Sequence, residues 1–270
     1  MSMSFPEPDD TDITAHVRWF AEYAARERAK EDADPAPMDL KRRHTLEVLA
    51  NARRIVAGGG VPPRLARACL LAALYHDVGR FEQYVRYHTF RDGESCDHGR
   101  QGVLVLKKER PLACEAPRLR LLVQAGVALH NRFALPTGAD ADAALVTNVV
   151  RDADKLDILR VIAEHLSGPG PYHPTVVLQQ PDDPAIASPA VLEAVRRHEV
   201  AHYGDLNCLN DFRLLLGTWF DDLHFRASRR QFLGDGHAVR ILRGIPDAAP
   251  QRAMRDLLLT RLREAACEGA

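Results

Sequence analysis

Cysteine is scarce in this chain of 270 residues, and its positions are scattered. The five cysteines never stand in a Cys-x-x-Cys spacing, so neither a disulfide framework nor a thiolate zinc site is indicated. They are Cys69, Cys96, Cys114, Cys208 and Cys267. An odd number of dispersed thiols is typical of a reducing compartment, so we expect a cytoplasmic protein.

Long apolar runs and an excess of one charge are also missing. No stretch holds the roughly 18 uncharged apolar residues that a membrane helix needs, and the acidic start MSMSFPEPDD is unlike a secretory signal. Lys and Arg number 36 against 37 Asp and Glu. This balance argues against a nucleic-acid polymer or a membrane surface as partner. We expect a small molecule instead, and the sequence leaves open whether the chain forms an oligomer.

Alternating Val, Ile and Thr runs are few, whereas apolar residues recur at steps of three and four. This period predicts an all-α fold. Expected helices span about 12–33, a segment around His44 that stops at the glycines 58–60, 64–75, a segment opened by His98, 117–130, 144–165, 190–203, 207–226 and 250–266. The aromatic and charged segment 80–97 has no clean period and predicts a loop. We expect one domain over 1–270, with a core at about 39–166, an N-terminal helix at 12–33 and a C-terminal helical extension at 167–270.

Histidine and aspartate recur in a specific order along the predicted core. His44 lies in mid-helix, His76-Asp77 ends an apolar helix and is followed by Val-Gly-Arg, and Asp154 stands in Ala-Asp-Lys-Leu-Asp. This order resembles the H…HD…D pattern of the HD-domain superfamily of metal-dependent phosphohydrolases, over about 39–165. The resemblance implies a helical bundle in which His44, His76, Asp77 and Asp154 are the primary metal ligands.

Two further histidines extend the resemblance. His98 in Asp-His-Gly-Arg-Gln-Gly and His130 in Ala-Leu-His-Asn-Arg are similar to the extra histidines of the binuclear branch, which implies a second metal ion and a bridging role for Asp77. The stretch His-Asp-Val-Gly-Arg-Phe-Glu-Gln-Tyr resembles a little-described bacterial HD group, which implies no particular substrate. The Gly-Tyr-Pro signature of cyclic-di-GMP-cleaving members is missing, so we do not assign that substrate.

The ligand types fit this chemistry on physical grounds. Imidazole nitrogens with carboxylate oxygens suit Mn, Fe, Co, Ni or Zn better than Ca or Mg. One or two such ions make a water nucleophilic and neutralise charge on a phosphate. Phosphoryl oxygens also need fixed positive charge, for which Arg80 and Lys155 are the first candidates and Arg132 and Arg86 the next. We predict hydrolysis of a phosphate ester of a small molecule, such as a nucleotide or another organic phosphate.

Each residue taken singly has a structural interpretation. His98 and His130 fit helix-cap or packing roles, Arg80 fits an exposed arginine, and Asp154 fits a surface partner on a charged helix, where Asp152 and Asp157 compete with it. Only the whole set favours a metal site. Two other functions remain open: an oxygen-dependent di-iron enzyme, which the same ligand types serve, and a non-catalytic helical sensor module.

A second metal motif stands in the C-terminal third. His198, Glu199 and His202 form His-Glu-Val-Ala-His, the spacing that places two zinc ligands and a glutamate base on one helix face. No third histidine follows at the metzincin spacing, so Asp211 or Asp221 would have to complete the site. An amphipathic helix with exposed polar residues is the alternative, and we rank a zinc peptidase below the phosphohydrolase.

Overall fold

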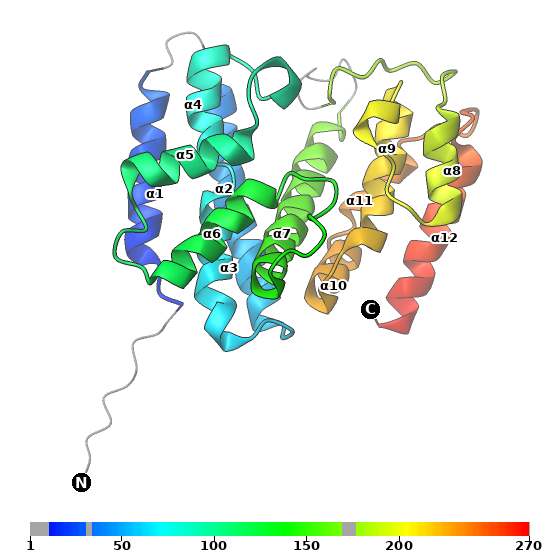
Figure 1. Ribbon diagram of the computed structural model, residues 1–270. Coiled ribbons are helices and arrows are strands. Elements are labelled where there is room, and N and C mark those ends of the chain that lie inside the picture. Colours follow the sequence, from blue (N-terminus) through cyan, green and yellow to red (C-terminus); the bar gives the residue numbers. More distant parts are fainter. Residues whose placement is uncertain (1–10, 31–33, 169–176, 270) are drawn as a thin grey trace. The chain divides into compact units, whose positions relative to one another are not determined.

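The computed structural model describes residues 11–30, 34–168 and 177–269 (Figure 1). These residues form helices and contain no strand, so the all-α prediction is confirmed. The chain divides into two compact units with the boundary between Asp154 and Lys155, inside one long helix. The single-domain assignment stays a prediction.

The first unit holds the segments that the predicted metal ligands occupy. Its helices are α1 (Thr14–Arg28), α2 (Ala36–Ala57), α3 (Pro63–Tyr75), α4 (Val78–Tyr87), the 3-10 helix η1 (Asp92–Glu94), α5 (His98–Glu109), α6 (Pro117–Leu129) and the beginning of α7 (Ala141–His165). Proline opens α3 and α6, because its fixed φ and missing N–H suit the first helical turn. The predicted helices of this unit are confirmed, with shifted ends.

Helix α3 is the central helix of the first unit and packs against α2 and α6. Residues 68–79 are all buried. The last two turns of α3, residues 68–75, hold only apolar side chains, as expected of a helix segment that is buried on every side. At Gly126 of α6 an added Cβ would lie 2.8 Å from Ala72 Cβ and 3.3 Å from a Val146 methyl. The missing side chain therefore lets α3, α6 and α7 approach closely, and it brings the ends of these helices together.

The loop predicted for 80–97 is wrong over its first half. Helix α4 begins directly after Asp77 and buries Val78, Phe81 and Tyr84, a spacing of three that places them on one helical face. Phe81 packs edge-on against Phe20 and Tyr23 of α1. The intervening Arg and Glu side chains hide this apolar face in the sequence.

The second unit is also helical and has α9 at its centre. Its helices are α8 (Pro189–Arg197), η2 (Tyr203–Asp205), α9 (Leu209–Thr218), η3 (Trp219–Asp222), α10 (Arg226–Asp235), α11 (His237–Arg243) and α12 (Arg252–Glu268). Every residue of α9 is buried, and α8, α11 and α12 pack against it. In the part of the chain that the structure describes, no helix is long and apolar enough to cross a membrane.

Three sequence predictions fail in the second unit. The helix predicted over 190–203 ends at Arg197, and the one over 207–226 ends at Thr218 before a 3-10 turn. Helices α10 and α11 were not predicted, since α10 is mostly polar and α11 spans only seven residues. Gly236, in the left-handed region at φ 65°, separates them, and glycine adopts that conformation without a steric cost.

Candidate metal centre

Six side chains from five helical segments converge in the first unit. His44 lies in the middle of α2, His76 and Asp77 join α3 to α4, His98 opens α5, His130 follows α6, and Asp154 lies on α7. The four histidines and Asp77 are buried, and the Asp154 side chain is 20% exposed. The structure therefore brings together all six residues that the sequence pattern singled out.

Asp77 lies at the centre, and each of its oxygens faces two imidazoles. Its Oδ2 is 3.8 Å from His44 Nε2 and 3.6 Å from His76 Nε2. Its Oδ1 is 3.5 Å from His98 Nε2 and 3.9 Å from His130 Nε2. Asp154 Oδ1 joins the first pair, 3.0 Å from His44 Nε2 and 3.8 Å from His76 Nε2. The oxygens of Asp77 thus divide the four imidazoles into two pairs, and Asp154 lies beside the first pair.

Hydrogen bonds on the far side of three rings set the direction of their lone pairs. Nδ1 of His76 donates to Ala73 O and Nδ1 of His130 donates to Val127 O, both at 2.8 Å. Nδ1 of His98 donates to a carboxylate oxygen of Asp92 at 2.6 Å. Because these acceptors carry no proton, each Nδ1 must hold one, and each neutral ring directs its Nε2 lone pair toward Asp77.

These lone pairs need a partner that the described side chains do not supply. His76 Nε2 is fully buried and has no hydrogen-bond partner among the described residues. The Nε2 atoms of His98 and His130 face each other at 3.0 Å, a contact that is repulsive between two neutral rings unless a cation lies between them. A divalent metal therefore fits this donor set.

The protonation states also suit a metal. Burial, together with neighbouring His98 and His76, lowers the pKa of His130 to about 3, and burial lowers the pKa of His76. Burial alone would raise the pKa of Asp77, but Lys41, His76 and Arg80 outweigh it and hold that pKa well below its usual range. Neutral imidazoles and ionised carboxylates are the forms that bind metal ions.

Three groups of described residues have donor atoms close enough to hold an ion. They are His44, His76 and Asp77; His76, His130 and Asp154; and Asp77, His98 and His130, with the donor atoms in each group within 4.8 Å of one another. In comparison with protein families, residues 42–159 match the HD domain.

The chain carries an HD domain. The matched residues include all six convergent side chains. Comparisons with curated proteins and with solved structures found no match. Members of the HD family are mostly metal-dependent hydrolases, and the match over residues 42–159 agrees with a site that can hold divalent metal.

One cation beside the candidate metal ligands was not predicted from the sequence. Lys41 Nζ lies 2.7 Å from Asp77 Oδ2 and 5.6 Å from the centre of the Phe90 ring. Lys41 precedes His44 by three residues on α2, and that spacing places two side chains on one helical face. This spacing is the signal that could have identified it.

The predicted phosphate-binding cations have other partners in the structure. Arg80 Nε lies 3.4 Å from Asp77 Oδ1, while its Nη1 donates to the Phe90 carbonyl at 2.5 Å. Arg132 Nη2 pairs with Asp97 at 2.6 Å, and Lys155 pairs with Asp222 in the second unit. Their roles toward phosphate stay predictions.

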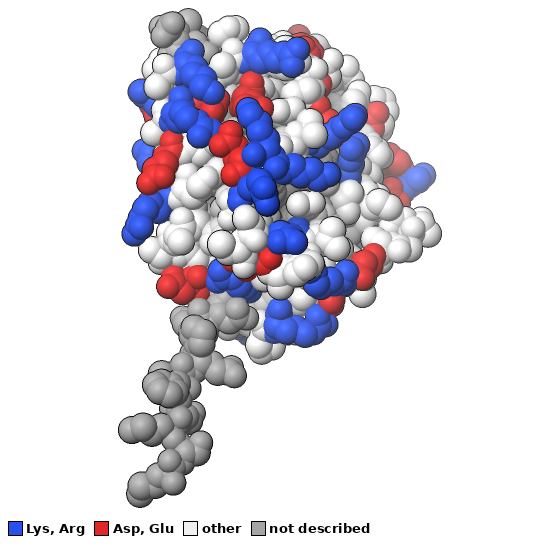
Figure 2. Space-filling view, turned by 60° about the vertical axis from the view of Figure 1, so that its left-hand side comes forward, with Lys and Arg blue, Asp and Glu red and all other residues white. Residues whose placement is uncertain are grey.

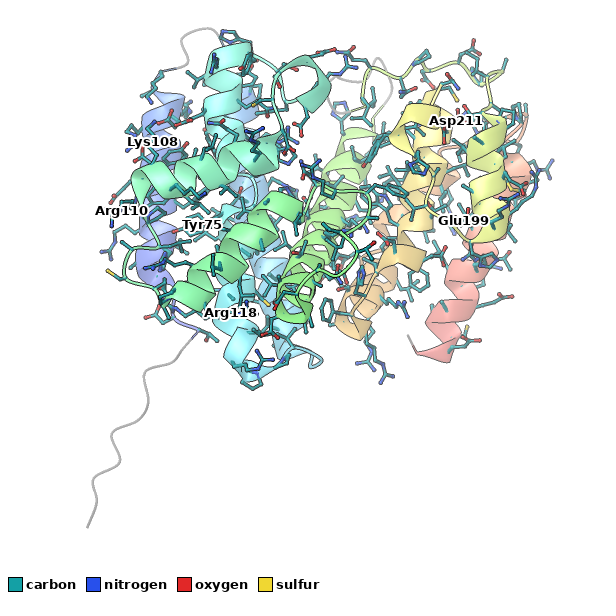
Figure 3. All side chains as sticks on the ribbon, viewed as in Figure 1. Tyr75, Lys108, Arg110, Arg118, Glu199 and Asp211 are labelled. Carbon is teal, nitrogen blue, oxygen red and sulfur yellow. The ribbon has the colours of Figure 1, made fainter. Side chains whose placement is uncertain are left out.

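Among the described residues, neither the competing aspartates nor the second metal motif belongs to any of these groups. Asp152 and Asp157, both described and buried, belong to none of the three groups, and Asp157 pairs with Arg160 at 2.6 Å. Helix α8 ends at Arg197, before the His-Glu-Val-Ala-His motif. His198 is left-handed at φ 61° and His202 is extended, and Glu199 follows the helix (Figure 3). The motif therefore lacks the single helix face that zinc peptidases use, so that interpretation loses its basis.

Proposed function

We propose that this chain is a metal-dependent phosphohydrolase that cleaves phosphate esters of small molecules and holds two divalent transition-metal ions. The observation that carries the proposal is the position of Asp77, whose two oxygens each face a separate pair of imidazoles. One ion would be held by His44, His76, Asp154 and Asp77 Oδ2. The other would be held by His98, His130 and Asp77 Oδ1.

The donor set narrows the choice of metal and chemistry. Four imidazoles and two carboxylates favour Mn, Fe, Co, Ni or Zn over Mg or Ca. When bound, such ions supply Lewis acidity, lower the pKa of water and neutralise charge on a phosphoryl group.

The residues of the chain contribute positioning and fixed charge. Lys41 and Arg80 both approach Asp77, one at each oxygen, so positive charge lies on two sides of the shared carboxylate. Phosphoryl transfer depends mainly on such positioning and electrostatic stabilisation. The Lys41 side chain is 21% exposed, so solvent reaches part of this residue beside the proposed metal ligands. We assign Lys41 to phosphate binding, and we keep Arg132 and Lys155 as further candidates.

A small substrate fits the surface better than a charged polymer does. On the face that Figure 2 shows, several Lys and Arg side chains adjoin near the centre, and Asp and Glu side chains lie beside them and toward the rim. Ion pairs of the first unit, such as Arg26 with Glu109 at 3.0 Å and Lys108 with Glu82 at 3.0 Å, neutralise part of the charge of that unit. A polymer-binding surface needs a basic stripe instead.

The test combines elemental analysis with phosphate release. We expect the purified protein to hold two transition-metal ions per chain and to release phosphate from p-nitrophenyl phosphate or a nucleotide panel under argon with Mn²⁺. Asp77→Ala should abolish both metal binding and turnover, whereas the control Glu199→Ala/His202→Ala should keep both. Loss of metal from the control alone would contradict the proposal, and turnover that requires iron and O₂ would move the function to a di-iron oxygenase.

A further inference from the structure

Asp92 links a proposed metal ligand to Arg80, a residue that contacts Asp77. Its Oδ2 accepts the Nδ1 proton of His98 at 2.6 Å. Its Oδ1 accepts from Arg80 Nη1 at 2.8 Å and from Gln83 Nε2 at 3.1 Å. Arg80 in turn places Nε 3.4 Å from Asp77 Oδ1. One carboxylate therefore connects His98 to the residues that surround Asp77.

The position of His98 in its helix explains why it needs an external acceptor. His76 and His130 follow the last residues of α3 and α6, where carbonyls lack helical partners, and each donates to the carbonyl three residues before it. His98 is the first residue of α5, where a helix exposes N–H groups rather than carbonyls. An anion there is also favoured by the helix dipole. A carboxylate from another segment can therefore supply the hydrogen-bond acceptor that α5 does not offer to His98 Nδ1.

Asp92 is itself held in place by α4 and the following segment. Gln83 is 1% exposed, and its Nε2 also donates to Ser95 Oγ at 2.8 Å and to the Cys96 carbonyl at 3.0 Å. Arg80 Nη1 adds the bond to the Phe90 carbonyl. The two α4 side chains thus fix both ends of the segment that carries Asp92.

We propose that Asp92 is a positioning residue for the second metal ion. It keeps the proton of His98 on Nδ1 and orients the ring, so that Nε2 faces Asp77 Oδ1 and His130. The inference rests on the proposed two-ion site and predicts a selective effect. Residues that orient metal-binding histidines typically contribute 10–100-fold to metal affinity, and that is roughly the loss we expect for the second ion alone.

Metal titration of the full chain tests this selectivity. In Asp92→Ala the second Mn²⁺ or Zn²⁺ should bind roughly 10–100-fold more weakly, while the first binds as in the wild type. Asp92→Asn should retain most of the affinity, because its amide oxygen still accepts the Nδ1 proton. Glu94→Ala is the matched control: Glu94 lies on the same 3-10 helix, has a half-exposed side chain and pairs with Arg91. It should bind both ions as the wild type does.

Nitrogen NMR of the metal-free protein provides a readout that a purely structural role would not change. Wild-type His98 should carry its proton on Nδ1, whereas Asp92→Ala should show a mixture of the two tautomers. An unchanged tautomer, an unchanged second affinity, or equal loss of both ions in Asp92→Ala overturns the inference, as does a wild-type chain that binds a single ion. Failure of the proposed function is distinguishable, because that protein would hold both ions and release no phosphate.

Discussion

Replacing Gly79 with alanine should damage stability and the second metal site together. Gly79 lies two residues after Asp77, where α4 packs against α5. A Cβ at this position would lie 2.4 Å from the His98 carbonyl oxygen and 2.5 Å from the Gly102 nitrogen. Both are backbone atoms, so no side-chain rotation relieves the overlap. Ordinary contact begins at 3.4 Å, so the two helices must separate by about 1 Å (3.4 minus 2.4).

The size of both effects follows from this displacement. Overpacking a buried contact costs typically 1–3 kcal/mol, and with two rigid contacts we expect about 3 kcal/mol for Gly79→Ala. In a chain of this length that lowers the melting temperature by about 6–12 °C. His98 must move with its carbonyl, whereas metal–ligand distances tolerate only about 0.2 Å. The second ion should therefore bind more weakly and the first should remain.

Thermal unfolding of the metal-free protein and metal titration of the same variant measure these effects. Gly234→Ala is the control, because it lies inside α10 with nothing within 4 Å of an added Cβ. Alanine there should stabilise by roughly 0.5–1 kcal/mol, since glycine is unfavourable inside a helix. A Gly79→Ala protein that melts like the wild type and binds both ions would refute the packing argument.

Three further predictions concern the site. Lys41→Met should keep both ions but lose about 100-fold in kcat/KM for a phosphate ester. Steady-state kinetics measure this loss, with the exposed α2 variant Arg43→Met as control. Equal kcat/KM values for the two variants would contradict the role of Lys41. Metal-free protein should lose stability as the pH falls from about 6.5 toward 3, because the folded state keeps His130 neutral at a pKa of about 3 while the unfolded chain takes up a proton. The slope is about 1.4 kcal/mol per pH unit, and a flat profile in urea unfolding would contradict it. Removing metal with a chelator should lower the melting temperature and Mn²⁺ should restore it; unchanged melting on chelation would argue against bound metal.

The sequence by itself determined the fold class and the residues to consider. Steps of three and four between apolar residues predicted the helices, because one helical face must be buried. His76-Asp77 after the apolar run 68–75, between His44 and Asp154, indicated a buried polar site in the correct chain order. Such features are local, so they can be recognised without knowing how the helices pack.

Tertiary structure alone decided how these residues are paired. Spacing along the chain does not say which imidazole faces which oxygen of Asp77, because the ligands come from separate helices. The spacing along the chain also does not reveal the proposed roles of Lys41 and Asp92, because these depend on contacts with α4 and with the segment 88–97. The His-Glu-Val-Ala-His motif shows that a metal spacing in the sequence does not ensure metal geometry. Its spacing suits zinc only on a continuous helix, and α8 ends at Arg197, before the motif. Metal geometry depends on directions in space, and only the packing of helices fixes those directions.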